Sequence, residues 1–212
     1  MMGLFKKYVN QTRKPEGFLG KLMVAGMNGG HAKLADWGME QLAGLAPKTV
    51  AEMGCGGGRN AGELLKRYPN AALTAIDYSA VSVEKAKACN QALISAGRCT
   101  VRQGNVSKLE LPDGAFDLAT AFETVYFWPG LERCFSEVAR VLAPGGHFLI
   151  VNESNGEDET GKKFERIIKG MTCYTAGQLA AALKAAGFAA VQITRHPRKP
   201  WIAVLAEKEK RQ

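Results

Sequence analysis

The sequence predicts an α/β fold, a three-layer sandwich around a mostly parallel sheet. Short apolar runs alternate with amphipathic stretches along most of the 212 residues, and this alternation is typical of strands joined by helical crossovers. A glycine-rich turn separates the first apolar run from the first helix that follows it. The last two apolar runs have no helical stretch between them, so we expect them to pair as antiparallel strands.

Seven runs are expected to be strands, and six stretches after residue 30 are expected to be helices. The strands span residues 50–53, 71–77, 98–104, 116–122, 148–152, 188–194 and 201–206. The helices span residues 31–45, 60–68, 80–95, 131–142, 162–169 and 176–186. Ser79 and Thr175 are expected N-caps. The Ala143-Pro-Gly-Gly-His segment is expected to end the helix over residues 131–142 before the fifth strand.

Composition indicates one soluble domain. Apolar residues make up 46% and charged residues 23% of a chain long enough for a full core. No apolar run approaches the length of a membrane span, and the first residues lack a signal-peptide core. The five cysteines are odd in number and form no C-x-x-C pair. We therefore expect reduced thiols in a cytoplasmic protein, with neither a disulfide framework nor a metal site.

The net charge of +8 is compatible with a nucleic-acid partner. The basic residues, however, concentrate near the two ends of the chain and are not interleaved with aromatic residues in a stacking pattern. This placement favours solvated surface charge. An attraction to acidic substrates or to a membrane surface is the main alternative.

The glycine-rich turn after the first strand indicates a nucleotide-type ligand site. Glycines allow a tight turn and a close ligand, and the following helix N-terminus offers free N–H groups to an anion. Asp77 ends the second strand, where an acid would hold a ribose hydroxyl pair. A dinucleotide-binding fingerprint needs its third glycine at position 59, which is Arg59. The pattern present is acid-x-G-x-G-x-G: Glu52, Gly54, Gly56, Gly58.

With these motifs, and with Leu-x-Pro-Gly-Gly at residues 142–146, the sequence resembles the class I S-adenosylmethionine (SAM)-dependent methyltransferases. The resemblance is to the methyltransferase type 11 group of small-molecule enzymes, including those of ubiquinone and menaquinone biosynthesis, and covers about residues 31–208. It implies a Rossmann-like, seven-stranded sheet with one reversed strand. It also implies transfer of a methyl group from SAM to a small-molecule acceptor by in-line displacement, with S-adenosylhomocysteine as product.

The resemblance also implies where the cofactor binds. The glycine loop would line the methionine portion, Glu52 would support the amino group or order the loop, and Asp77 would accept from both ribose hydroxyls. Asn105 stands where the family often has an acid, and its carbonyl oxygen can still accept a hydrogen bond. The expected cofactor-binding residues are Glu52, Gly54, Gly56, Gly58, Asp77, Tyr78, Asn105, Val106 and Phe122.

The acceptor side is expected beyond the carboxyl end of the fourth strand. We hypothesise that Glu123 or His31 orients the acceptor or removes its proton. Tyr126 and Trp128 are candidate acceptor-binding residues, and their alternative role is packing of the loop. For His31 the alternative is a position at a helix start without a chemical role.

The chain is expected to be a single domain, residues 1–212. Residues 1–46 would form a helical extension, including a short helix over residues 18–27, and residues 47–208 the SAM-binding core. In small-molecule methyltransferases such an extension often lies over the cofactor and acceptor pocket. Covering the edge of the sheet is the alternative.

Three other functions stay open. An NAD-dependent oxidoreductase is disfavoured by Arg59 and by the Pro-Gly-Gly segment. A SAM-binding protein without catalysis is disfavoured by the intact glycine loop. A nucleic-acid acceptor is disfavoured because Glu-Thr-Val-Tyr follows the fourth strand, where base-methylating enzymes have an Asn-Pro-Pro-Tyr type of segment. The sequence leaves open the acceptor, the methylated atom and whether the protein is a monomer or a homodimer.

Overall fold

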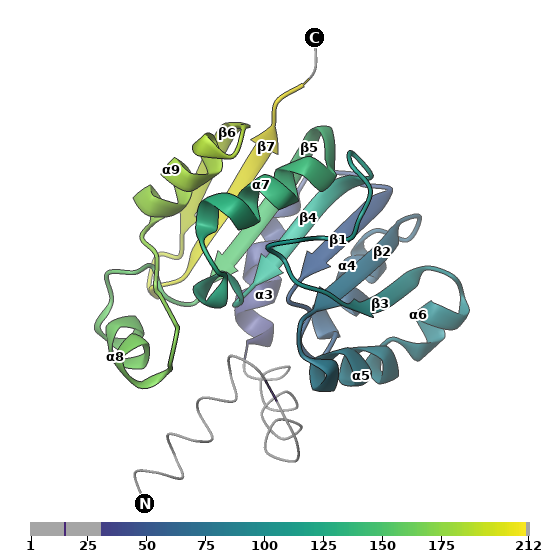
Figure 1. Cartoon of the computed structure of the whole chain (residues 1–212), viewed down its shortest axis with the longest axis horizontal. Coiled ribbons are helices and arrows are strands. Elements are labelled where there is room, and N and C mark those ends of the chain that lie inside the picture. The colour runs from purple at the N-terminus through teal and green to yellow at the C-terminus, as the bar shows by residue number, and fades with distance from the viewer. Residues whose placement is uncertain (1–14, 16–30, 211–212) are drawn as a thin grey trace, which may run out of the picture.

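The computed structural model describes residue 15 and residues 31–210. Within them a seven-stranded sheet has the order β3-β2-β1-β4-β5-β7-β6 (Figure 1). Strands β1 to β5 pair in parallel, and β7 is antiparallel to both of its neighbours. This confirms the expected fold class with its reversed strand. The strands are β1 (Thr49–Met53), β2 (Ala72–Asp77), β3 (Cys99–Gln103), β4 (Phe116–Phe122), β5 (Leu142–Asn152), β6 (Phe188–Arg195) and β7 (Ile202–Lys208).

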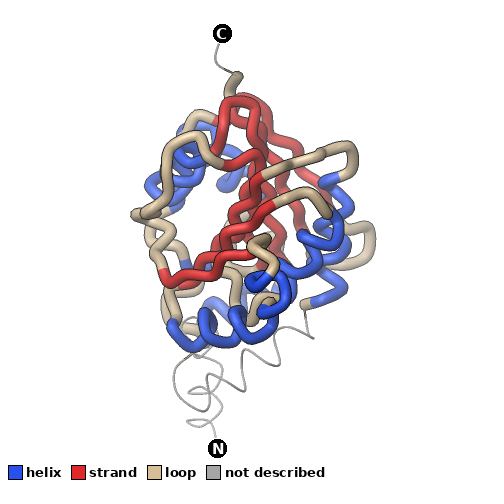
Figure 2. Tube along the Cα trace, turned by 90° about the vertical axis from the view of Figure 1, so that its right-hand side faces the viewer, coloured by secondary structure: helices blue, strands red, loops and turns tan. Residues whose placement is uncertain are grey.

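Helices cover both faces of the sheet (Figure 2). The hydrophobic side chains on one face of the sheet pack against α7 and α9. Those on the other face pack against α3, α4 and α5. The α-helices are α3 (Ala32–Met39), α4 (Arg59–Arg67), α5 (Ala80–Cys89), α6 (Gln91–Ser95), α7 (Leu131–Val141), α8 (Glu159–Ile167) and α9 (Ala176–Ala185). Two short 3-10 helices, η2 (Glu40–Leu42) and η3 (Val125–Phe127), follow α3 and β4.

Both expected N-caps are confirmed. The Ser79 side chain accepts a hydrogen bond from the Ser82 N–H at the start of α5. The Thr175 side chain caps α9, and Gln178 completes a capping box by accepting from the Thr175 N–H. Each cap satisfies one of the N–H groups that a helix start leaves without an internal partner.

The prediction of one helix over residues 80–95 was wrong, because the helix breaks at Asn90 and α6 begins after it. Asn90 is buried with φ −110° and ψ 19°. Its side-chain amide donates to the carbonyl oxygens of Gly58, at 2.8 Å, and Ala86, at 3.0 Å. A side chain that bonds to backbone in this way competes with the regular helix, and here it ties the end of α5 to the glycine loop.

Strand β5 begins six residues earlier than the predicted residue 148, at Leu142. Leu142 already pairs with Phe116, whereas His147 pairs with Leu118. The Ala143-Pro-Gly-Gly segment is therefore an irregularity inside the β4–β5 pairing, and the helix that precedes it ends at Val141.

The predicted helix over residues 31–45 is α3 followed by η2, so the regular helix ends at Met39. Gly38 lets α3 approach the sheet closely, because a Cβ atom there would lie 2.4 Å from a Val151 methyl group. The Arg59 guanidinium also binds the Asp36 carboxylate at 2.7 Å, which ties α3 to α4. The helix predicted over residues 18–27 lies outside the described residues.

Candidate ligand-binding site

The carboxyl ends of β1, β2, β4 and β5 meet at one edge of the sheet. Strands β2 and β4 flank β1 on its two sides. The chain therefore crosses over first to one side of β1 and later to the other side. In open α/β sheets, ligands bind in the crevice at such a switch point. A cavity of about 260 Å³ lies there. Nine of the thirteen predicted site residues line it: Gly54, Gly56, Asp77, Tyr78, Asn105, Val106, Phe122, Glu123 and Trp128.

The glycine loop forms one wall of this cavity. The N–H groups of Gly54 and Cys55 both donate to the Ile76 carbonyl oxygen, at 2.7 and 3.0 Å, which holds the loop against β2. Gly54 has φ +76°, and a Cβ atom there would lie 2.2 Å from the Thr124 hydroxyl oxygen. The loop can therefore lie this close to the end of β4 only with glycine at that position.

Gly58 does not line the cavity. It begins α4 in the left-handed conformation, with φ +81°. A Cβ atom there would lie 2.7 Å from the Ala86 Cα atom. Gly58 thus lets the loop and α4 pack against α5, and its part in ligand binding is indirect.

Asp77 lies between the cavity and the glycine loop. One carboxylate oxygen accepts from the Gly56 N–H and the other from the Ser79 N–H, both at 2.9 Å. Burial raises the pKa of Asp77, and these N–H donors oppose that shift. The Tyr78 N–H and the Ser82 side chain also bond to this carboxylate. Asp77 thus holds the loop in shape at the wall of the cavity.

Glu52 is buried behind the loop, with 1% of its surface exposed, and does not border the cavity. Burial raises its pKa to about 8, and the charge of Asp77 adds to that shift. A carboxylic acid in this environment holds its proton at neutral pH. Its position fits ordering of the loop better than direct contact with a ligand.

Another part of the cavity wall is largely apolar. Met53, Ile76 and Val106 line it beside the partly exposed Tyr78 ring. The Asn105 side-chain oxygen accepts from the Ser107 N–H and hydroxyl, at 3.0 and 2.9 Å. A flat aromatic group such as a purine suits this part of the cavity, because apolar walls with a few polar groups are typical of small-molecule sites.

Glu123 lies at the end of β4 and borders both this cavity and a smaller one of about 60 Å³. Its φ of 59° is the one positive value for a non-glycine residue among residues 31–210, and such strain is common at functional sites. Burial raises the pKa of Glu123 to about 8, despite the hydrogen bond that it accepts from the Glu153 N–H.

Tyr126 lies behind Glu123 and does not line the cavity. Its hydroxyl donates to a Glu123 carboxylate oxygen at 3.1 Å and accepts from the Ser154 N–H at 3.0 Å. Trp128 does line the cavity, while its indole N–H donates to the Thr124 hydroxyl at 3.2 Å and its ring stacks on Phe148. The loop after β4 therefore supports Glu123 from behind and adds an aromatic wall.

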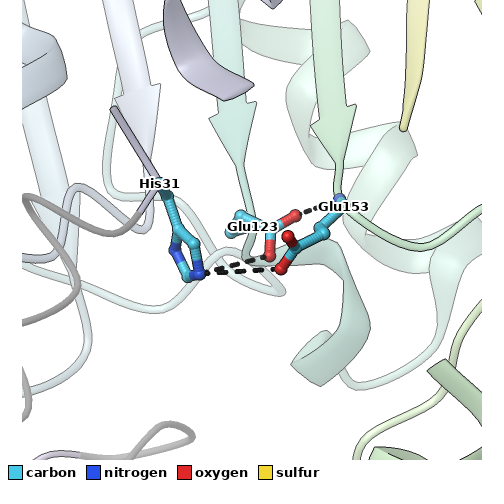
Figure 3. A group of neighbouring side chains, drawn as sticks. All are labelled: His31, Glu123 and Glu153. Atoms are coloured by element: carbon cyan, nitrogen blue, oxygen red, sulfur yellow. Dashed lines mark hydrogen bonds and ion pairs between the residues drawn. The ribbon is translucent and has the colours of Figure 1, made fainter. Parts of the chain in front are cut away.

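His31 comes just before α3 and borders the smaller cavity together with Glu123. Its Nε2 atom lies 4.0 Å from a Glu123 oxygen and 3.9 Å from a Glu153 oxygen (Figure 3). Burial lowers the pKa of His31, and the charge of Glu153 offsets part of that shift. The structure thus brings the two predicted catalytic candidates together, and it adds Glu153.

Sequence reasoning missed Glu153 and several wall residues. Glu153 directly follows β5, and β5 ends beside β4. The rule that pointed to Glu123 therefore also applies to Glu153. The apolar wall residues Met53, Ile76 and Phe127 carry no chemical signal in the sequence. Pro15 also lines the larger cavity and accepts a hydrogen bond from the Ser79 hydroxyl at 2.7 Å.

Comparisons with known proteins identify this architecture. A protein family described as "Methyltransferase domain" matches residues 51–150. The chain is 35% identical over 107 residues to a fatty-acid O-methyltransferase of Mycolicibacterium smegmatis, with 50% of this chain and 38% of the relative covered. It is 29% identical over 163 residues to a malonyl-[acyl-carrier protein] O-methyltransferase of Geobacter sulfurreducens, with 71% and 59% covered.

The fold agrees with solved structures. A SAM-dependent methyltransferase of Aquifex aeolicus superposes with a TM-score of 0.72 at 18% identity, covering 88% of this chain and 97% of that one. The first two curated relatives are longer than the region they share with this chain, since the match spans 38% and 59% of their lengths. The family match over residues 51–150 and the fold of the solved structures both agree with the resemblance to the class I SAM-dependent methyltransferases.

Proposed function

We propose that this protein transfers a methyl group from SAM to a small-molecule acceptor. The observation that carries the proposal is the cavity at the switch point, which joins the glycine loop, Asp77 and Glu123 in one site. Bound SAM supplies an electrophilic methyl group whose leaving group is a neutral thioether. The protein must therefore hold donor and acceptor in line and remove a proton where the acceptor requires it.

The residues present fit SAM. The backbone of Gly54 and Gly56 suits the methionine end, because glycines leave the loop open to a ligand. Asp77 would hold the ribose, because it lines the cavity and its carboxylate oxygens are hydrogen-bond acceptors. The apolar wall of Met53, Ile76 and Val106 suits the adenine ring.

Glu123 and His31 would act on the acceptor. The Glu123 carboxyl lies on the cavity wall, fixed by Tyr126 and by the Glu153 N–H. Its pKa of about 8 lies near physiological pH, and the ionised form that can take a proton becomes more populated as the pH rises toward 8. Because burial lowers the pKa of His31, its imidazole is neutral at pH 7 and can also take a proton.

A small molecule is the acceptor class that we favour. Phe127, Trp128 and Pro129 form an apolar rim beside Glu123, which suits an acceptor with an apolar body and one polar reacting group. The relatives named above are a fatty-acid O-methyltransferase and a malonyl-[acyl-carrier protein] O-methyltransferase. We therefore infer an acceptor with an acyl or similar apolar chain and expect no action on nucleic acid.

The N-terminal extension, residues 1–46, would cover this site. Pro15 borders the larger cavity and His31 the smaller one, so both described points in the first 31 residues lie at the ligand edge. Within residues 31–210, no helix is both long and apolar enough to span a membrane. We place the protein in the cytoplasm, where its five free cysteines would stay reduced.

The test is a methyl-transfer assay with radiolabelled SAM against a panel of fatty acids, acyl thioesters and quinols, with transfer RNA as the nucleic-acid arm. Once an acceptor is found, Glu123→Gln and His31→Asn are compared with wild type. We expect at least one variant to lower kcat by about 10²- to 10⁴-fold, as loss of general-base catalysis does. Full activity of both variants would refute the catalytic assignment, and exclusive methylation of RNA would refute the acceptor class.

A further inference from the structure

Three side chains from separate elements converge beside the proposed methyl-transfer site (Figure 3). His31 precedes α3, Glu123 ends β4 and Glu153 follows β5. One donor atom from each lies within 4.8 Å of the other two. One imidazole nitrogen and two carboxylate oxygens form a donor set that suits first-row divalent cations.

The Glu123 carboxyl is held with one oxygen directed at this cluster. Its Oε1 atom accepts from the Tyr126 hydroxyl and from the Glu153 N–H. Its Oε2 atom faces His31 Nε2 at 4.0 Å, and within residues 31–210 it accepts no hydrogen bond. Only 11% of the side chain is exposed. Glu123 also borders the smaller cavity, so this oxygen is available to a ligand bound there.

The other two donors can move toward a cation. The His31 side chain is 32% exposed and the Glu153 side chain 55%, and His31 makes no side-chain bond to the start of α3. Metal–ligand bonds of about 2.1 Å put neighbouring donor atoms about 3 Å apart. Closing the observed 3.9 and 4.0 Å separations to that value needs the His31 Nε2 atom to shift by about 1 Å relative to the two carboxylates.

We propose that His31, Glu123 and Glu153 bind one divalent transition-metal cation, such as Mn²⁺, Fe²⁺ or Zn²⁺, with coordination positions left open. The smaller cavity, which borders His31 and Glu123, gives access for water or for an acceptor oxygen. A bound cation would orient that oxygen and favour its deprotonation. This last role rests on the proposed methyl transfer, whereas cation binding itself does not.

The experiment titrates the chelator-treated full-length protein with Mn²⁺ and measures free Mn²⁺ by electron paramagnetic resonance. Wild type is expected to bind one Mn²⁺. Glu153→Gln and His31→Ala each remove a ligand and should weaken binding at least about tenfold, as even indirect changes at metal sites do. Glu157→Gln is the matched control, because Glu157 is an exposed acid in the same loop, and it should bind as wild type does.

Two results would overturn the proposal. One is the absence of Mn²⁺ binding by wild type up to about 1 mM, the range of a very weak complex, which would mean that the three groups only share protons. The other is equal binding by wild type and Glu153→Gln. SAM binding by the chelator-treated protein is measured in parallel by calorimetry. Intact SAM binding with failed Mn²⁺ binding refutes the cation site alone, whereas lost SAM binding refutes the proposed function.

Discussion

Glu52 should make the stability of the fold depend on pH. It is the fourth of the five residues of β1, with 1% of its surface exposed, and its Oε2 atom has no hydrogen-bond partner among the described residues. Burial raises its pKa to about 8 from an ordinary value of 4.5, with a further contribution from the charge of Asp77. The perturbation is Glu52→Gln, which keeps the shape of the side chain and removes its ionisation.

The direction in which stability changes with pH follows from how many protons Glu52 binds in the folded and unfolded chains. Between pH 4.5 and about 8 the folded chain keeps a proton on Glu52 that the unfolded chain loses. This contribution to stability is therefore fully present below pH 4.5 and is lost as the pH rises through 8. Each pKa unit corresponds to about 1.36 kcal/mol, so the whole shift is worth at most about 5 kcal/mol. About 3 kcal/mol of it falls between pH 5.5 and 8.

The assay is urea unfolding of wild type and Glu52→Gln at pH 5.5, 6.5, 7.25 and 8. The free energy of unfolding of wild type should fall relative to that of the variant by about 2 to 3 kcal/mol across this range. Glu84→Gln is the control, since Glu84 is exposed on α5, and it should follow the wild-type pH dependence. Parallel curves for wild type and Glu52→Gln would refute the reasoning.

Three further predictions concern single contacts. Gly54→Ala places a methyl group against Thr124 and should abolish SAM binding in calorimetry while lowering Tm. Asn90→Ala removes the amide that joins α5 to the glycine loop and should lower the free energy of unfolding in urea by about 1 to 3 kcal/mol; an unchanged midpoint would contradict this. Tyr126→Phe leaves the buried Ser154 N–H without its acceptor and should cost about 1 to 3 kcal/mol in the same assay, whereas a cost below about 0.5 kcal/mol would contradict it.

Most of the fold could be predicted because local signals agree with the tertiary structure. Apolar runs, glycine and proline breaks and two N-caps located most strands and helices of the core to within a few residues, although the start of β5 and the end of α3 each differ by six residues. Asn90 shows where this approach fails. Its side chain bonds to Gly58, 32 residues away, and nothing in the local sequence indicates that partner.

The site could be predicted in part for a similar reason. Residues at the carboxyl ends of parallel strands, such as Asp77 and Glu123, must lie at one edge of the sheet. The surroundings of the other site residues depend on tertiary packing. The sequence does not reveal that Tyr126 lies behind Glu123, or that Glu52 is enclosed by neighbouring strands. The positive φ of Glu123 likewise has no signal in its residue type.

Calorimetric titration of the protein with SAM, S-adenosylhomocysteine and NAD tests the central claim most directly. We expect SAM and S-adenosylhomocysteine to bind and NAD not to bind. Asp77→Ala should weaken SAM binding by about 10- to 100-fold, the value of a hydrogen bond to a charged group. Asp113→Ala, which changes an exposed acid before β4, should bind SAM as wild type does. Tighter binding of NAD, or equal SAM affinity in wild type and Asp77→Ala, would contradict the account.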